Sequence, residues 1–286
     1  MTDYIDVNKA LWDERADVHA ASPDYSLSRF ADDPQHISHV VRFDLPRLGD
    51  ISGQRAVHLQ CHIGTDTISL ARLGARVTGL DFSAPALAQA RALAASAGVE
   101  VDFVESDLYG APDVLPHHAF DLVFTGIGAL CWLPDIRRWA EVVATLLAPG
   151  GRLFIREGHP MLWALDDERS DELVVRYPYF EQAEPHVFDA DGTYVETDAS
   201  FQNTASHEWN HGLGEIVTSL IEAGLRLDFL HEHRTVAWQA LPMMEPVDGT
   251  VAEGSHHQRR VGWQLPEGLR DLVPLMYSLK ASRPAE

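Results

Sequence analysis

Cysteine is scarce in this chain of 286 residues: it has Cys61 and Cys131 and no others, and apolar residues flank both. A small secreted scaffold would carry a denser set, so we expect no disulfide framework and a reducing, cytoplasmic location. The sequence also has no apolar run long enough to span a membrane and no basic-apolar leader. Neither a membrane protein nor a secreted protein is therefore expected.

Basic residues are also in short supply. The 22 Lys and Arg face 43 Asp and Glu, which gives a formal net charge of −21. Such a charge repels nucleic-acid phosphates and anionic lipids, so we expect no nucleic-acid and no membrane partner. A neutral or cationic small molecule is easier to accept. The hydrophobic content of 45% supports a sizeable core in one large α/β domain with an insertion.

Glycine is missing where a dinucleotide-binding turn would need it. Residues 56–81 predict a strand, a turn, a helix and a second strand that ends on Asp81, which together form a right-handed βαβ unit. Open α/β sheets bind ligands at the edge where such a turn lies, and Asp81 could accept hydrogen bonds from two ribose hydroxyls. A pyrophosphate needs G-x-G-x-x-G, but the comparable positions are Gln60, His62 and Gly64. Polar side chains there suit an amino-acid carboxylate or ammonium group better, and they leave a nicotinamide oxidoreductase as a distant alternative.

The rest of the chain continues the alternation of strands and helices. Ser83 is a plausible N-cap for a helix over 84–97, which Gly98 ends. Strands are predicted at 101–107, 120–125, 152–156, 225–231 and 272–279, and helices at 6–16, 35–49, 135–147 and 215–223. This order favours a sheet with helices on both faces.

The order and spacing of these motifs resemble the class I S-adenosylmethionine-dependent methyltransferases. The first motif of that family is an acidic residue followed by G-x-G-x-G, and here His58, Gln60 and His62 replace the acid and two glycines. Leu59–Asp66 looks like a variant found in a branch of small-molecule methyltransferases, and Leu147-Ala-Pro-Gly-Gly151 matches another mark of the family. The resemblance covers residues 55–160 well and 205–236 moderately. It implies a Rossmann-like seven-stranded sheet, mostly parallel with the last strand antiparallel, with helices on both faces and an inserted substrate lid.

The chain then divides into four parts. Residues 1–50 are expected to form an N-terminal helical cap, and residues 51–160 the core that binds S-adenosylmethionine. Residues 161–206 are rich in aromatics and acids and are predicted to be a lid, partly a β-hairpin of 184–190 and 193–199 around Gly192. Residues 207–286 would complete the sheet, with a mobile loop at 242–260.

The resemblance also implies a site. The function expected is methyl transfer from S-adenosylmethionine to O or N of a small, aromatic or heterocyclic molecule. The residues expected to bind this cofactor are Trp12, Gln60, His62, Gly64, Asp66, Asp81, Phe82, Ser83, Asp107, Leu108 and Thr125. Those expected to bind the methyl acceptor are Tyr4, Trp132, Trp163 and Trp209.

Three histidines are candidates for catalysis. His159 leaves a central strand at the ligand edge and is our first choice for a general base; His207 and His211 could orient a substrate. Residues 207–211 also match H-E-x-x-H, the zinc motif, but Gly212 and Gly214 follow at once, so no metal is expected. The alternatives left open are a protein that binds S-adenosylmethionine without catalysis and a zinc-dependent hydrolase that uses His207 and His211. The sequence leaves the oligomeric state open.

Overall fold

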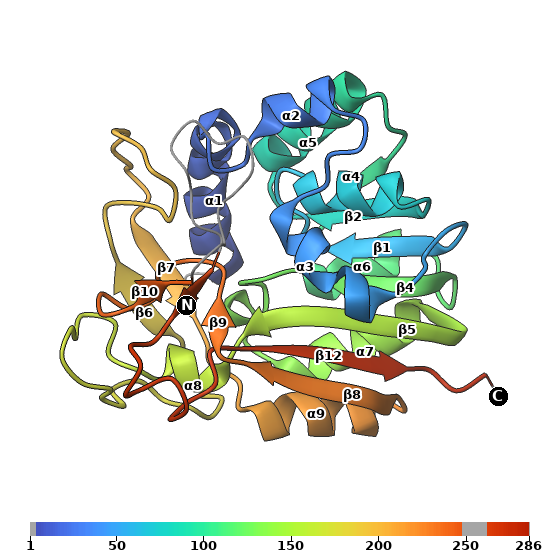
Figure 1. Cartoon of the computed structure of the whole chain (residues 1–286). Helices are drawn as coiled ribbons and strands as arrows, with labels where there is room; N and C mark the ends of the chain where they lie inside the picture. The colour runs from blue at the N-terminus through green and yellow to red at the C-terminus, as the bar shows by residue number, and fades with distance from the viewer. Residues whose placement is uncertain (1–3, 248–261, 286) are drawn as a thin grey trace.

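A seven-stranded sheet organises the protein (Figure 1). The computed structural model describes residues 4–247 and 262–285. From edge to edge the strands are β3 (Asp102–Glu105), β2 (Arg76–Asp81), β1 (Arg55–Leu59), β4 (Phe120–Thr125), β5 (Leu147–Gly158), β12 (Met276–Ser282) and β8 (Arg226–His233). β12 runs antiparallel to both of its neighbours, and the pairs from β3 to β5 are parallel. The predicted fold class is confirmed.

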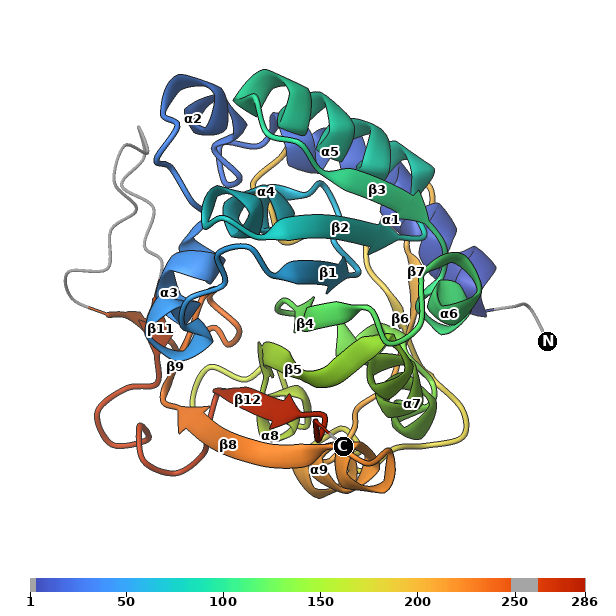
Figure 2. The ribbon, with the colours of Figure 1, turned by 90° about the vertical axis from the view of Figure 1, so that its right-hand side faces the viewer.

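Helices cover both faces of this sheet (Figure 2). One face carries α3 (His39–Leu48), α4 (Thr65–Arg72) and α5 (Ala84–Ala97), and the other carries α6 (Ala111–Val114), α7 (Ile136–Leu146) and α9 (Leu213–Glu222). Two of the predicted helix ends are visible in the local geometry of α5. The Ser83 hydroxyl accepts a hydrogen bond from the Ala86 amide, and Gly98 ends the helix at φ +63°.

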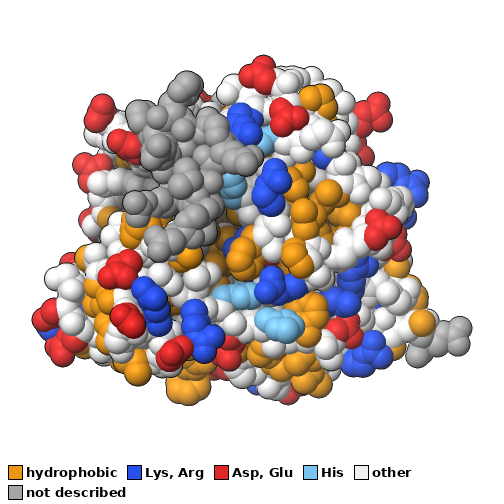
Figure 3. Space-filling view, in the orientation of Figure 1, with side chains coloured by type: hydrophobic (Ala, Val, Ile, Leu, Met, Phe, Trp, Pro, Cys, Tyr) orange, Lys and Arg blue, Asp and Glu red, His pale blue; other side chains and the backbone are white. Residues whose placement is uncertain are grey.

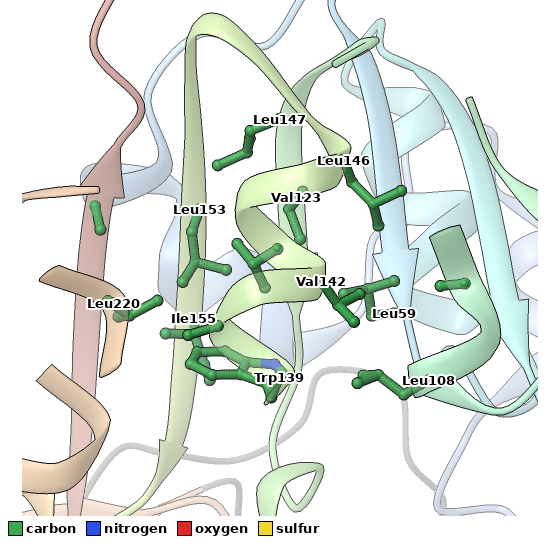
Figure 4. Close-up of a cluster of buried hydrophobic side chains, with 14 of the residues drawn as sticks. Leu59, Leu108, Val123, Trp139, Val142, Leu146, Leu147, Leu153, Ile155 and Leu220 are labelled. Atoms are coloured by element: carbon green, nitrogen blue, oxygen red, sulfur yellow. The ribbon is translucent and has the colours of Figure 1, made fainter. Parts of the chain in front are cut away.

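The larger core lies under α7 (Figure 4). Trp139 of α7 is fully buried against Val123, Leu153 and Ile155, which β4 and β5 direct toward this helix. Removing so large a buried ring would cost about 3–5 kcal/mol of unfolding free energy. The strands therefore lie in fixed register, and their carboxyl ends form a stable edge for a site.

Two additions lie beyond that edge. The first is the N-terminal pair α1 (Tyr4–Ala21) and α2 (Leu27–Asp32). The second follows β5: α8 (Pro160–Trp163), β6 (His186–Asp189) and β7 (Ala205–Glu208), with β6 and β7 paired antiparallel. In Figure 1, α1 stands between the segment that carries β6 and the upper half of the sheet. We call residues 184–208 the insert.

Three expectations about element boundaries are wrong. The partner of β6 is β7 and not residues 193–199, which form no strand. The last strand begins at Met276, because residues 269–273 form turns. Of the loop expected at 242–260, residues 248–260 lie outside the described residues, and Glu245–Pro246 form β10, which joins β11 (Trp263–Gln264) and β9 (Thr235–Val236). Among the helices of residues 4–247 and 262–285, none has both the length and the apolar character to cross a membrane.

Candidate functional site

A cavity of about 1040 Å³ opens at the carboxyl edge of the sheet. Its walls come from the turn after β1, the ends of β2 and β4, α1, α3 and the insert. Ligand pockets usually span about 300–1,000 Å³, so this cavity can contain a large cofactor together with a small second molecule. Figure 3 shows Lys, Arg and His side chains gathered near the middle of one face, despite the acidic net charge. Among the residues that line the cavity, the basic or imidazole side chains are Arg15, His36, His39, Arg42, His58, His62 and Arg156.

The turn between β1 and α4 keeps the backbone of a glycine-rich loop without the glycines. Gln60 and His62 have φ values of +56° and +49°, in the left-handed region that L side chains rarely occupy. Their side chains line the cavity. The sequence therefore retains a strained conformation at two positions in order to place polar groups where glycine would leave bare backbone.

Gln60 presents an unsatisfied acceptor. Its Nε2 donates to the Ala129 carbonyl over 2.9 Å, while its Oε1 is buried without a hydrogen-bond partner. A buried amide oxygen without a donor costs free energy, so an ammonium group beside Gln60 would satisfy it. This orphaned atom fits the amino-acid end of the cofactor that the sequence implies.

Asp81 lies at the end of β2, where the ribose of that cofactor is expected. Its two carboxylate oxygens accept from the amides of His62 (2.8 Å) and Ser83 (2.9 Å), and each oxygen keeps a second lone pair. Burial raises the pKa of Asp81 to about 6, partly offset by these backbone hydrogen bonds. Phe82 lines the cavity beside it, and its carbonyl accepts from the Lys9 ammonium of α1.

Asp107 and Leu108 line the cavity where the adenine is expected. Asp107 Oδ1 accepts from the amides of Tyr109 and Gly110 at 2.9 and 3.1 Å and so caps the short 3₁₀ helix Leu108–Gly110. Its other oxygen remains available to a ligand, since no described group donates to it.

Three of the residues expected to bind the cofactor do not line the cavity. A Cβ on Gly64 would approach the Ala90 Cβ to 2.8 Å, so this glycine allows α4 and α5 to pack rather than a ligand to approach. Ser83 caps α5, and Thr125 is fully buried with an unpartnered hydroxyl. All three support the walls of the site from behind.

The aromatic predictions have mixed outcomes. Trp12, Tyr4, Trp132 and Trp163 line the cavity. Trp12 contacts the rings of His62 and Trp132, each with centroids 5.2 Å apart. The ring of Trp209, in contrast, is buried against Tyr4 outside the cavity.

None of the three histidines chosen for catalysis lines the cavity. His159 caps α8 through Nδ1, and its Nε2 contacts Glu232 at 3.1 Å. The strand alternation of β7 places Ser206 and Glu208 on the cavity side and His207 on the other face. Because all three side chains lie outside the cavity lining, their positions argue against a role as general bases. The sequence could not reveal this, since the positions depend on contacts with residues far away in the sequence.

The zinc alternative fails on the same geometry. His207 lies in β7 and His211 lies after it, so the two are not neighbours on one helix. His211 directs Nδ1 to Glu181 at 2.8 Å and Nε2 to the carbonyls of Leu130 and Leu133 at 3.1 and 2.8 Å. Both ring nitrogens are therefore engaged and neither can bind a metal. Within the described ranges, no cluster of three potential metal ligands occurs.

His58 stands where the family motif has an acidic residue, and it is a further residue of the cavity wall. It is 3% exposed on β1 and still lines the cavity, with Nδ1 2.9 Å from the Thr67 hydroxyl. Its Nε2 and the Oδ2 of Asp66 lie 3.6 and 3.5 Å from the position of a Cβ on Gly126, just after β4. Burial lowers the pKa of His58 to about 3 and raises the pKa of Asp66. A neutral imidazole and a carboxyl group thus face the same point.

Glu208 is a second residue that lines the cavity and was not among the predicted site residues. It lines the cavity from β7, accepts from the Ser206 hydroxyl at 2.7 Å, and has its pKa raised by burial. Tyr177 and Phe188 lie near it in the cavity wall, with ring centroids 5.7 Å apart. In the sequence, Glu208 belongs to the H-E-x-x-H match and to a segment expected at the mouth of the substrate site, but nothing there singles it out as a residue of the cavity wall.

Comparison with known proteins agrees with this geometry. A family model described as a methyltransferase domain matches residues 56–151. A ubiquinone biosynthesis O-methyltransferase from Cronobacter sakazakii is 36% identical over 110 residues, which covers 38% of this chain and 44% of that protein. A demethylmenaquinone methyltransferase from Thermus thermophilus is 35% identical over 120 residues, 40% of this chain and 53% of that protein. The chain spans about half the length of the curated relatives it matches.

The fold comparison extends further along the chain. A crystal structure of an S-adenosylmethionine-dependent methyltransferase from Mesorhizobium loti superposes with a TM-score of 0.53 at 21% identity, over 85% of this chain and 95% of that one. The strand order with an antiparallel β12, and a cavity at the carboxyl edge, define the class I methyltransferase fold. Residues 56–151 therefore match a methyltransferase domain, and the chain has the fold of the S-adenosylmethionine-dependent methyltransferases.

Proposed function

We propose that the protein transfers the methyl group of S-adenosylmethionine to an oxygen or nitrogen atom of a small aromatic or heterocyclic molecule. One observation carries the proposal. A single cavity of about 1040 Å³ joins the turn of Gln60 and His62 to a chamber lined by Trp132, Tyr177 and Phe188. The name of the Cronobacter relative, an O-methyltransferase, supports oxygen as the acceptor atom.

The chain's own residues fit the parts of the cofactor. Asp81 would accept from the ribose hydroxyls, and Asp107 with Leu108 would contact the adenine. Gln60 and His62 would contact the amino-acid end, with Asp66 nearby. When bound, S-adenosylmethionine supplies a methyl group that is already activated by its sulfonium. The protein then has to align the acceptor with that methyl group and exclude water.

We assign proton removal to His58. The Cys61 thiol donates to the His62 carbonyl, and the Thr67 hydroxyl bonds the same thiol. If Thr67 donates to this thiol and accepts from His58 Nδ1–H, Nε2 is an unprotonated acceptor toward the cavity. An acceptor O–H or N–H above Gly126 would donate a hydrogen bond to Nε2. Because a pKa of about 3 makes this imidazole a weak base, the proton would pass to Nε2 only as the new bond to the methyl carbon forms, the carbon–sulfur bond breaks and the acceptor becomes acidic.

The cap and the insert complete this arrangement. Residues 1–50 and 161–206 are proposed as the cap and the lid of the acceptor chamber, as the sequence implied. Their aromatic rings would stack on a flat acceptor, and Glu208 would accept a hydrogen bond from its polar substituent.

The test begins with the cofactor product. S-adenosylhomocysteine is titrated calorimetrically into the wild type, Asp81→Ala and, as a control, Asp171→Ala, an exposed carboxylate paired with Arg169. Micromolar binding that Asp81→Ala loses by at least tenfold, and Asp171→Ala keeps, is the expected result. No binding by the wild type would refute the proposed function.

Turnover is the second stage. Formation of S-adenosylhomocysteine from S-adenosylmethionine is followed with catechol, caffeate, 8-hydroxyquinoline and tryptamine as acceptors. His58→Asn is expected to bind S-adenosylhomocysteine like the wild type and to lose at least about 100-fold in kcat, as removal of a general base does. Binding without turnover of any O–H or N–H acceptor would favour the non-catalytic alternative.

A further inference from the structure

A chain of side-chain hydrogen bonds runs from the cofactor turn to the insert. His62 Nε2 lies 2.9 Å from His19 Nδ1 of α1, and His19 Nε2 lies 2.6 Å from the Thr193 hydroxyl. His19 is fully buried and lies on the buried face of α1 with Asn8, Leu11, Arg15 and Ala16. Three segments far apart in the sequence thus meet at one histidine.

Aromatic rings fix the geometry of this chain. The Trp12 ring contacts both imidazoles, with centroids 5.8 Å from His19 and 5.2 Å from His62. The ring of Tyr194, next to Thr193, lies 4.6 Å from His19. The contacts enclose the two histidines, so neither ring can turn without moving α1 or the insert.

Other bonds attach the insert to α1 alone. Arg15 donates to the carbonyls of Gly192 and Asn203, and Glu14 accepts from the amides of Gln202 and Asn203. None of these groups reaches the turn after β1. Of the hydrogen bonds between α1 and the insert among the described residues, the bond from His19 to Thr193 is the one that continues through a second hydrogen bond to a residue of the cofactor turn.

The hydrogen bonds of this chain must all run in one direction. Burial lowers the pKa of His62 to about 3 and of His19 to about 4, so each ring carries one N–H near pH 7. If Thr193 donates to His19, His19 donates to His62 and Nδ1 of His62 carries the remaining hydrogen. Nδ1 of His62 has no hydrogen-bond partner among the described residues, and its side chain lines the cavity. A carboxylate there would fix this direction, and an ammonium group the opposite one.

We propose that His62 and His19 are positioning residues that fasten the insert to the cofactor: the amino-acid end of the cofactor bonds Nδ1 of His62, and the bond through His19 to Thr193 then closes the insert over the acceptor chamber. This inference depends on the proposed function. The strained φ of +49° at His62 is explained by this arrangement. A glycine at this position would have no side chain to make the hydrogen bond to His19.

Hydrogen exchange of residues 190–204 tests the proposal, with S-adenosylhomocysteine as the probe. In the wild type, saturation with this ligand is expected to slow exchange of the segment by at least about tenfold. His62→Gly suits the left-handed backbone and preserves the fold, but it should abolish the protection and weaken binding by about three- to tenfold, the equivalent of one hydrogen bond.

Thr193→Val separates the link from the binding contact. It removes the hydroxyl at the insert end while His62 stays, so the protection should be lost and affinity should fall no more than about threefold. The matched control is Thr197→Val, which removes an exposed hydroxyl of the same insert that bonds only the Ala199 amide. This control should be protected like the wild type.

Two outcomes overturn the proposal. One is wild-type protection in both His62→Gly and Thr193→Val. The other is normal binding of S-adenosylhomocysteine by the wild type without any slowing of exchange in the insert. Calorimetry distinguishes these outcomes from a failure of the proposed function. If the proposed function is wrong, the wild type does not bind S-adenosylhomocysteine at all, and the proposed link through His62 and His19 is then wrong as well.

Discussion

Gln60 has a strained backbone conformation, and replacing it should change ligand affinity more than it changes the free energy of unfolding. Gln60 has φ +56° and a side chain, a combination that costs about 1–2 kcal/mol. Gln60→Gly removes that strain and also removes one hydrogen bond to Ala129, so the free energy of unfolding in urea should change by less than about 1 kcal/mol. Affinity for S-adenosylhomocysteine should fall by about tenfold, because the orphaned Oε1 is lost.

His118 provides the control for this prediction. It has φ +52°, is exposed, and lies outside the cavity lining. His118→Gly should therefore leave S-adenosylhomocysteine affinity unchanged. Equal loss of affinity in both variants, or none in Gln60→Gly, would mean that Gln60 does not contact the cofactor.

At the scale of elements, one carboxylate shapes the loop after β4. Glu157, 3% exposed at the end of β5, accepts from the amides of Gly128 (2.5 Å), Ala129 (2.7 Å) and Leu130 (3.1 Å). Glu157→Gln would turn an N–H₂ group toward these donors and should cost about 2–3 kcal/mol. Glu141→Gln, on the exposed side of α7, should cost almost nothing. Urea unfolding compares the two, and equal midpoints would refute this role.

A buried ion pair joins α3 to β5. Arg156 Nε lies 2.7 Å from Asp44 Oδ1, and the side chains are 3% and 0% exposed. Asp44→Ala leaves a buried guanidinium unpaired and should cost about 3–5 kcal/mol, whereas replacing both partners, Asp44→Leu with Arg156→Met, should recover most of that loss. Unfolding free energies of the single and double variants measure this. A double variant as unstable as the single one would show that packing, rather than charge, explains the cost.

Helix ends could be predicted from neighbouring residues in the sequence. The pairing of strands that lie far apart in the sequence could not. The N-cap Ser83 and the stop at Gly98 delimit α5 from sequence alone, since both act within one turn. The partner of β6 could not be found in this way, because β7 lies about twenty residues on, and Gly192 offered a nearer turn. The same holds for the site: the ribose position of Asp81 follows from one βαβ unit, whereas the burial of His159 against Glu232 depends on β8.

At the scale of the whole molecule, buried histidines lower stability as the pH falls. Burial lowers the pKa of five of them well below the ordinary 6.5, to about 3 for His58 and His62 and about 4 for His19, His36 and His233. The unfolded chain therefore binds more protons at these positions below pH 6.5. Their contribution to stability is complete above pH 6.5 and is lost as the pH falls toward 4.

Buried acids oppose this trend. Burial raises the pKa of Asp44 and Asp81 to about 6, and it also raises the pKa values of Asp66, Glu157 and Glu208, so the folded protein binds more protons at these acids as the pH falls. The slope of stability against pH below pH 6 is therefore the difference between the two opposing sets, and each proton corresponds to up to about 1.4 kcal/mol per pH unit.

Urea denaturation between pH 7 and pH 5 measures this slope. His36→Phe removes one of the five histidines, and its ring can keep the edge-on contact with Phe30, so the slope should decrease by about 1.4 kcal/mol per pH unit. A slope that His36→Phe leaves unchanged would mean that His36 takes up a proton in the folded state between pH 7 and 5. The cavity wall at His36 would then be wetter than the 3% exposure of this side chain implies, and burial could not be what lowers its pKa.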